Sequence, residues 1–147
     1  MYVIWLLFRI VFYSPNCQDE DVFVVPPGKQ YEEIADIMLE KIYNFNQIPF
    51  EQIYIRSYDG IILSSRYYHN KDNAPIFIFF HGYRGNAVRD YSDFYDFAVS
   101  MGFNSLVVDQ RARGKSGGHV ITFGIKERYD CQLWCEYAAE RFGDAPV

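Results

Sequence analysis

The run Ile76–Phe80, with the sequence Ile-Phe-Ile-Phe-Phe, is the feature that most constrains how this chain can fold. A strand with one face in water alternates apolar and polar residues, whereas this run is apolar throughout. It therefore predicts a strand buried on both faces, as in a parallel sheet with helices on each side. Parallel strands need crossover connections, and these are usually helices.

The residues after this run predict such a crossover. An apolar stripe at helical spacing covers residues 91–101, Asp90 is a candidate N-cap, and Gly102 is a candidate stop. A second buried strand, Ser105–Val108, is predicted directly afterwards. Strand, helix and strand in this order predict a βαβ unit. The stripe consists of Tyr91, Phe94, Tyr95, Ala98 and Met101.

Two further patterns come before this unit. Apolar residues at steps of three and four predict an amphipathic helix over Gln30–Phe45. The ranges Phe50–Ser57 and Ile61–Tyr68 are typical of strands, and the Asp-Gly pair at 59–60 between them favours a tight hairpin.

After the unit, a second helix is predicted over Lys126–Phe142, with Gly143 as its stop. Residues 145–147 then have the character of the approach to another parallel strand. The fold class is therefore α/β, with a β-hairpin followed by parallel βαβα units and an incomplete sheet.

The first thirteen residues, Met1–Tyr13, are apolar except for Arg9. A helix of this length spans roughly 20 Å, less than the hydrocarbon core of about 30 Å. The segment lacks the basic start and small-residue cleavage site of a secretory signal. Three interpretations stay open: the end of an anchor that begins earlier, an interfacial or shallow anchor, and a helix packed on the domain.

The cluster Pro26-Pro27-Gly28 is the best linker candidate. We therefore predict an apolar amino-terminal segment with its linker over residues 1–25 and a domain over residues 26–147. Membrane contact is an expectation for residues 1–13, and the localisation stays open between membrane-associated and cytoplasmic.

Charge and composition limit the partners. Fourteen Lys and Arg residues against nineteen Asp and Glu give a formal charge of −5, so we expect no nucleic-acid partner. Thirteen Phe and thirteen Tyr in 147 residues are typical of a folded chain and not of a disordered one. The three cysteines, at positions 17, 131 and 135, match no metal or redox spacing, and we expect no metal and no cofactor.

The range Gly114–Gly118 fits the pattern Gly-x-Ser-x-Gly of a nucleophile elbow. An elbow lies between a buried strand and a helix that begins at once, whereas this piece is six residues past the predicted strand and is followed by a poor helix start. We therefore interpret the match as coincidental. The same residues fail as a phosphate loop, because Asp109 stands where the first glycine is required.

The other candidates have structural interpretations. Cys131 and Cys135, one helical turn apart on an apolar stripe, are expected to be core thiols. Asp109 is expected to cap the following turn through Arg111 or Arg113. His69 and His119 are expected in exposed loops, and a solvated rim is expected for Arg84, Arg89, Arg111 and Arg113.

Two blocks of sequence resemble the α/β-hydrolase superfamily. His81-Gly82 follows the strand predicted over 76–80, and the block Asp109–Gly118 is similar to the family's Asp-x-Arg-Gly-x-Gly-x-Ser pattern, with Ala112 in place of a glycine. The predicted elements also follow the family's order, so the resemblance covers about residues 48–147. The apolar start followed by Phe12–Pro15 resembles a membrane-associated bacterial branch of the superfamily.

The resemblance implies a role for the loop that begins at His81. In this family the turn after the His-Gly pair gives one backbone N–H to an oxyanion hole, which corresponds here to Tyr83. Gly82 and Gly85 would let the turn approach a substrate closely, and His81 is expected to hold the loop by a hydrogen bond rather than to act as a base.

A complete triad in this fold needs Ser, then Asp or Glu, then His, and no histidine follows His119. The resemblance therefore implies the amino-terminal half of a serine hydrolase for ester or amide bonds, with nucleophile, acid and base outside these 147 residues. Its substrate would be a small molecule or a peptide, and the isolated chain would be inactive. The alternative is a non-catalytic, membrane-associated binding module or a decayed pseudoenzyme.

Overall fold

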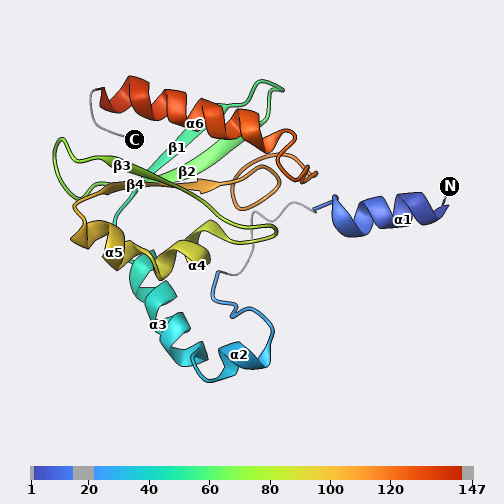
Figure 1. Ribbon diagram of the computed structural model, residues 1–147, viewed down its shortest axis with the longest axis horizontal. Coiled ribbons are helices and arrows are strands. Elements are labelled where there is room, and N and C mark those ends of the chain that lie inside the picture. Colours follow the sequence, from blue (N-terminus) through green and yellow to red (C-terminus); the bar gives the residue numbers. More distant parts are fainter. Residues whose placement is uncertain (1, 15–21, 144–147) are drawn as a thin grey trace.

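A computed structural model describes residues 2–14 and 22–143. A sheet of four strands lies between two layers of helices (Figure 1). The elements follow one another as α1 (Tyr2–Val11), α2 (Lys29–Glu32), α3 (Ala35–Asn46), β1 (Glu51–Arg56), β2 (Ile62–Tyr68), β3 (Ile76–Phe80), α4 (Ala87–Ser92), α5 (Tyr95–Ser100), β4 (Asn104–Asp109) and α6 (Glu127–Phe142).

The strand order is β1-β2-β4-β3, with β3 and β4 parallel and the other two pairs antiparallel. The predicted hairpin is confirmed: the Ser57 N–H donates to the Ile61 carbonyl over 2.8 Å, and Gly60 takes a φ of +86°. The βαβ unit is also confirmed, because β3 has the predicted bounds and β4 extends the predicted strand by one residue at each end. Within the described part of the chain β3 pairs only with β4, so the sheet is open at this edge. The strand predicted over residues 145–147 lies outside the described residues.

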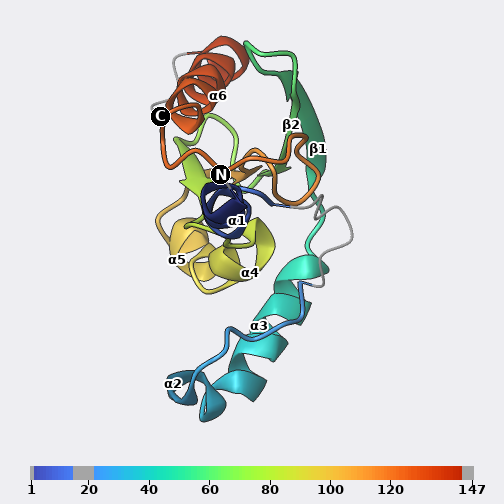
Figure 2. The same cartoon turned by 90° about the vertical axis from the view of Figure 1, so that its right-hand side faces the viewer.

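Two predicted helices are each divided in two. The prediction of one helix over 30–45 is wrong, because Ile34, at φ −113° and ψ 4°, separates α2 from α3. The amino-terminal part of α3 extends away from the sheet (Figure 2), so the packing that buries Ile42 and Phe45 does not reach the predicted first turns.

The helix predicted over 91–101 is divided at Asp93 and Phe94 into α4 and α5. The N-cap prediction for Asp90 is wrong as well. The cap is Asn86, whose side-chain oxygen accepts from the N–H groups of Val88 and Arg89 over 3.0 and 3.1 Å, so the helix begins before Asp90.

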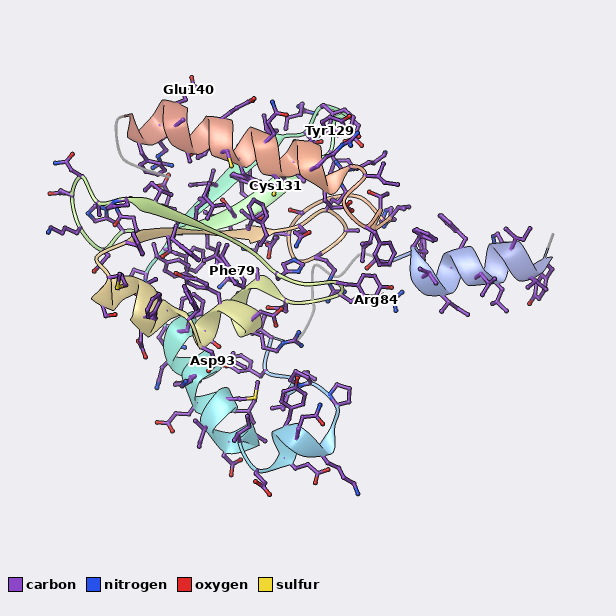
Figure 3. The ribbon with its side chains drawn as sticks, viewed as in Figure 1. Phe79, Arg84, Asp93, Tyr129, Cys131 and Glu140 are labelled. Atoms are coloured by element: carbon purple, nitrogen blue, oxygen red, sulfur yellow. The ribbon has the colours of Figure 1, made fainter. Side chains whose placement is uncertain are left out.

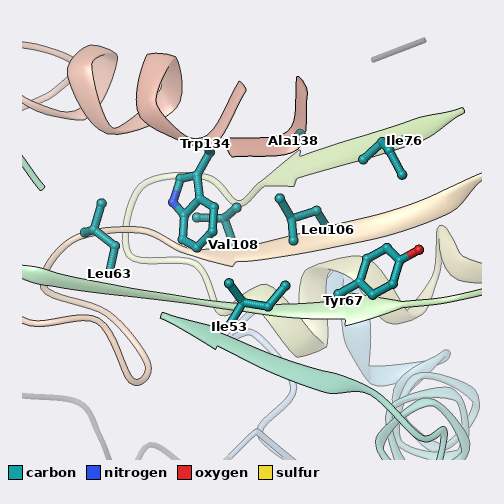
Figure 4. Packing of buried hydrophobic residues seen from close by; sticks show 8 residues of the cluster. All are labelled: Ile53, Leu63, Tyr67, Ile76, Leu106, Val108, Trp134 and Ala138. Carbon is teal, nitrogen blue, oxygen red and sulfur yellow. The ribbon is translucent and has the colours of Figure 1, made fainter. Parts of the chain in front are cut away.

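The two faces of the sheet carry separate hydrophobic clusters. Helix α6 covers one face through Trp134 and Ala138, which pack with residues of all four strands (Figure 4). Helices α3, α4 and α5 cover the other face with a cluster that centres on Tyr91. The carboxyl ends of β3 and β4 therefore emerge side by side between the two helical layers.

Helix α1 extends away from the rest of the molecule (Figure 1). None of its residues is buried, so the interpretation as a helix packed on the domain is wrong for Tyr2–Val11. Contact begins at the last residues of the helix, where the Ile10 and Val11 carbonyls accept from Arg84 and Tyr83, and it continues where Tyr13 pairs with Val120 and Ser14 is buried. Of the described helices, none has the length and apolar character needed to span a bilayer.

Candidate active site

The loop that follows β3, residues 81–86, lies at the carboxyl edge of the sheet, where open α/β sheets place their ligands. The Gly85 N–H donates to the Gly82 carbonyl over 2.9 Å and closes the turn. A Cβ at Gly85 would meet the Asp90 carboxylate and would lie 3.0 Å from the Gly82 carbonyl oxygen, so a larger residue there would require the Asp90 side chain and the turn to shift. A Cβ at Gly82 would meet nothing within 4 Å, which leaves the backbone there open to an incoming molecule.

His81 joins this loop to the loop that follows β4. The Gln110 N–H donates to His81 Nε2 over 3.2 Å, so Nε2 is an acceptor and the ring proton is on Nδ1, which donates to the Gly82 carbonyl over 2.9 Å. The Gln110 side-chain amide also donates to the His81 carbonyl. Burial lowers the pKa of His81, which keeps the ring neutral. The geometry places His81 as a positioning residue, with both ring nitrogens occupied by backbone groups.

Tyr83 is at the exposed tip of this loop, with 51% of its surface accessible. Its side chain turns away from the sheet, because the hydroxyl donates to the Val11 carbonyl over 2.7 Å and the ring stacks on Phe123. Its backbone N–H has no acceptor within hydrogen-bond distance in residues 2–14 and 22–143. The Tyr83 N–H is therefore one of several backbone donors of this loop, together with those of Gly82 and Arg84, that no described residue occupies.

Arg113, in the loop that follows β4, also fixes the 81–86 loop. Its side chain is 8% exposed and donates to the Gly85 carbonyl over 3.0 Å and to the Arg84 carbonyl over 3.1 Å. Arg84 has a positive φ of +52°, and these hydrogen bonds help to keep that conformation. The solvated rim predicted for the arginines is thus wrong for Arg113, because its guanidinium is used inside the protein.

Arg111 also departs from the rim prediction, being 2% exposed. Its guanidinium binds Asp130 in bidentate fashion, over 2.6 and 2.7 Å, and Asp59 over 3.0 Å. Burial alone would disfavour the charge, yet these two carboxylates raise the pKa of Arg111 above its ordinary value. The network ties the β4 loop to α6 and to the β1–β2 turn. Of the other two arginines predicted to form a solvated rim, Arg84 is exposed and Arg89 is half-buried beside Asp90.

A cavity of about 230 Å³ lies between α6 and the carboxyl ends of β3 and β4. Apolar side chains, among them Leu63, Phe80 and Trp134, form most of its wall. A smaller hollow of about 20 Å³ lies beside the 81–84 loop. Both are bordered by Gln110, Arg111 and Glu127, so the open backbone of the loop and the apolar cavity are neighbours.

Solved structures with this arrangement are known. An esterase of Pyrococcus furiosus superposes with a TM-score of 0.61 at 22% identity, over 92% of this chain and 44% of the esterase. A hyperthermophilic esterase of Pyrobaculum calidifontis superposes with a TM-score of 0.56 at 18% identity, over 99% of this chain and 44% of the esterase. An α/β hydrolase of Vibrio vulnificus gives a TM-score of 0.54 at 19% identity, over 80% of this chain and 38% of the hydrolase.

This chain has the α/β-hydrolase fold. It spans less than half the length of each of these three proteins. No known protein-family model matches it.

Within the α/β-hydrolase fold, the block 109–118 forms the loop after β4. Ala112 takes a positive φ of +61°, a conformation that glycine adopts more readily, which explains the glycine in the pattern that the sequence resembles. Ser116 is 1% exposed; its hydroxyl accepts from the Ser64 N–H over 2.8 Å and donates to the Asp109 carbonyl. It fastens the loop to β2, and no helix follows it directly, so the geometry of an elbow is missing here.

Asp109 does cap this loop, though through other donors than predicted. Its carboxylate accepts from the Lys115 N–H over 3.1 Å and from the Ser64 hydroxyl over 3.2 Å, whereas Arg111 lies on Asp59 and Asp130. Burial raises the pKa of Asp109. The Asp109 side chain therefore links the loop backbone at Lys115 to β2 at Ser64.

The cysteine prediction holds for neither thiol in full. Cys131 is half-buried in the wall of the large cavity (Figure 3), where burial raises the pKa of its thiol. Cys135 is exposed, so its prediction as a core thiol is wrong. The buried stripe of α6 consists of Asp130, Trp134 and Ala138, and Cys135, which follows Trp134 in the sequence, is on another side of the helix. Cys17 lies outside the described residues.

The remaining residues were weak signals in the sequence. His69 and His119 are exposed, as predicted. Gln110, Arg113 and Asp130 were not predicted to shape the site, because nothing in the local sequence shows their distant partners. Across residues 2–14 and 22–143, no three His, Cys, Asp or Glu side chains are grouped to hold a metal ion.

Proposed function

We propose that this chain is the amino-terminal part of a serine hydrolase that cleaves ester bonds, or the related amide bonds, through an acyl-enzyme. The fold supports the hydrolase class, and the names of two of the similar structures support ester chemistry. In this proposal the nucleophile, the acid and the base of the catalytic triad come from residues outside this 147-residue sequence.

The observation that carries the proposal is the Tyr83 backbone N–H, which has no acceptor among the described residues and borders the hollow of about 20 Å³ that shares Gln110, Arg111 and Glu127 with the apolar cavity. Attack on an ester carbonyl puts negative charge on the carbonyl oxygen, and a fixed N–H donor stabilises that charge in the transition state. His81 and Arg113 hold the loop in place, so the donor is oriented before the substrate arrives.

The proposal has a direct test in the native full-length protein. A fluorophosphonate probe should label a serine outside residues 1–147, and hydrolysis of short p-nitrophenyl esters should disappear with that label. Labelling of Ser116, lost in Ser116→Ala, would show that the elbow was misassigned. Absence of both labelling and hydrolysis would favour a non-catalytic module.

The donor itself can be removed without changing a side chain. Replacing the amide between Gly82 and Tyr83 by an ester deletes the N–H, and we expect kcat to fall by about 10²–10³-fold, as for loss of one oxyanion donor. The matched control is the same replacement before Asp72, an exposed residue in the loop at the opposite end of β3. Equal rates in the two ester variants would remove Tyr83 from the mechanism.

A further inference from the structure

The described molecule displays an exposed apolar helix with one charged residue, Arg9. The helix α1 is Tyr-Val-Ile-Trp-Leu-Leu-Phe-Arg-Ile-Val, and its apolar side chains from Tyr2 to Ile10 are between 40% and 73% exposed. At about 100° per residue, these consecutive side chains surround the whole helix. A helix that docks in a protein groove is apolar on one side, whereas a helix apolar all round matches a hydrocarbon environment.

The carboxyl end of α1 is fixed to the candidate catalytic loop. The last carbonyl groups of a helix have no partner within the helix. Here the Arg84 guanidinium donates to the Ile10 carbonyl over 2.6 Å, and the Tyr83 hydroxyl donates to the Val11 carbonyl over 2.7 Å. The cation also lies at the negative end of the helix dipole. Figure 3 shows Arg84 at the tip of its loop, facing α1.

Further contacts stiffen this joint. Phe123 packs edge-on against Phe12 and stacks on Tyr83, with ring centroids 5.5 and 4.8 Å away. The Ile121 N–H donates to the Phe12 carbonyl over 2.8 Å, and the Ser14 N–H donates to the His119 carbonyl over 2.9 Å. Arg113 binds the Arg84 and Gly85 carbonyls of the same loop, so the loop is hydrogen-bonded both to α1 and to the loop that follows β4.

We propose that α1 inserts into a lipid surface and that Tyr83 and Arg84 hold the candidate catalytic loop at the lipid–water boundary. The ten residues of α1 span about 15 Å, which is roughly one leaflet of a hydrocarbon core of about 30 Å.

The direction of insertion follows from where the polar groups lie. Arg9 is near the carboxyl end of α1, over the rings of Trp5 and Tyr13 at 5.1 and 5.4 Å, and Arg84 binds that same end. Two cations and the Tyr13 ring at the carboxyl end match the phosphate and interfacial level of a bilayer, while the amino-terminal turns, which include Trp5 and carry no charged side chain, enter the acyl chains. The joint with the loop is therefore at headgroup depth.

This position has a consequence for substrate that rests on the proposed function. A loop held at headgroup depth meets molecules whose polar group lies at the surface and whose chain lies in the lipid. The substrate class is then an amphiphilic ester or amide with an acyl chain, for which the apolar cavity beside the loop is chemically matched.

Binding is tested in the native full-length protein with phosphatidylcholine vesicles, with and without phosphatidylglycerol. The double variant Ile4→Glu, Leu7→Glu places two charges on exposed positions of α1 and should lower the bound fraction at least about tenfold. The matched control is Ile37→Glu on α3, an apolar residue of similar exposure, 57%, which should bind as the unchanged protein does. Phosphatidylglycerol should strengthen binding, because Arg9 and Arg84 are at the headgroup level.

Depth is tested with Trp5. Lipids brominated along the acyl chain should quench its fluorescence, and the quenching should disappear in Trp5→Phe, which leaves the buried Trp134 unchanged. If a water-soluble quencher lowers the fluorescence of Trp5 and the brominated lipids do not, α1 lies outside the lipid, and this result would overturn the proposal.

The coupling is tested with Arg84→Met. In the unchanged protein, vesicle binding should slow hydrogen exchange of the amides of residues 82–85; in Arg84→Met the vesicles should still bind, but this protection should be lost. Protection that survives Arg84→Met would overturn the coupling. These readouts do not depend on hydrolysis, so failure of vesicle binding overturns this inference alone. Binding with hydrolysis of neither short nor acylated esters overturns the proposed function and leaves the lipid contact standing, whereas hydrolysis of short esters alone overturns the acylated substrate class.

Discussion

On the α4 side of the sheet aromatic rings fill the space against β3 and β4, whereas on the α6 side a mixture of aliphatic and aromatic residues and buried charges surrounds a cavity of about 230 Å³. Tyr91 shows the first kind of packing: it is fully buried, and five aromatic rings have centroids 5.0–6.3 Å from its own. Arg111, held by Asp59 and Asp130, shows the second. The aromatic face has a hollow of about 340 Å³ between α3 and helices α4 and α5, whereas the cavity on the α6 face lies against the sheet beside the candidate site.

The largest effect should come from the aromatic face. Tyr91→Ala should lower the free energy of unfolding of the native protein by about 3–5 kcal/mol, because it leaves a cavity among rigid rings. Tyr91→Phe, which deletes the hydrogen bond of 2.5 Å to the Ser105 hydroxyl, should cost about 1 kcal/mol. Urea denaturation measures both. A loss below 1 kcal/mol in Tyr91→Ala would mean that this face is no better packed than the other.

A second prediction concerns the charges of the α6 face. Asp130→Ala leaves the buried guanidinium of Arg111 without its bidentate partner and should cost about 3 kcal/mol. The control is Asp93→Ala, which removes a pair with Lys41 in which both side chains are about half exposed, and it should cost less than about 1 kcal/mol. Equal costs for the two variants would show that the buried network contributes no more than a surface pair.

The same network predicts an acid dependence. Burial acts to raise the pKa of Asp59, but hydrogen bonds from Arg111, Lys126 and Ser57 hold it well below its ordinary value of 3.8. Below about pH 4 the Asp59 carboxyl is therefore protonated in the unfolded chain but still ionised in the folded protein. The stability that this carboxylate contributes is present above that pH and is lost as the pH falls further. Asp59→Asn should flatten this part of the pH profile of unfolding, and an unchanged slope would assign the acid sensitivity to other carboxyls.

The difference between the two faces also explains what the sequence could and could not predict. Strands β3 and β4 were predicted within one residue, because a run of apolar residues depends on burial alone. The Asp-Gly hairpin was predicted from local backbone chemistry. Arg111 was assigned to a solvated rim because its partners, Asp59 and Asp130, are 52 and 19 residues away along the chain. Periodicity likewise gave no sign of the break at Asp93, because packing against the sheet decides where the crossover helix divides.

Asn86 is a different kind of error, because the signal was present. An asparagine at the start of a helical stretch is a good N-cap, and the sequence favoured Asp90 only because the apolar stripe was counted from Tyr91. The loop itself was placed correctly after β3, yet its supports from Gln110 and Arg113 come from the neighbouring strand's loop. Local patterns thus predicted where the candidate loop lies in the fold, and only the tertiary structure shows what holds it.

The smallest effects offer the sharpest comparison of the two faces, because a leucine replaces a smaller residue on each. Ala98→Leu adds volume to the aromatic face at a fully buried position and should cost about 1–3 kcal/mol through overpacking. Cys131→Leu adds volume to the wall of the cavity and should be neutral or stabilising by up to about 1 kcal/mol. The two variants are compared by urea denaturation of the native protein.

The sign of the Cys131→Leu result decides what the cavity is for. If the opening is part of a substrate site, it stays empty in the native protein, and the larger side chain enters it without strain while reducing binding of long-chain esters. If residues after 147 occupy it, Cys131→Leu collides with them and costs as much as Ala98→Leu. A tolerated substitution thus supports a site built on the α6 face, whereas an equal loss on both faces would show that the apparent asymmetry of the sheet belongs to this part of the chain and not to the whole protein.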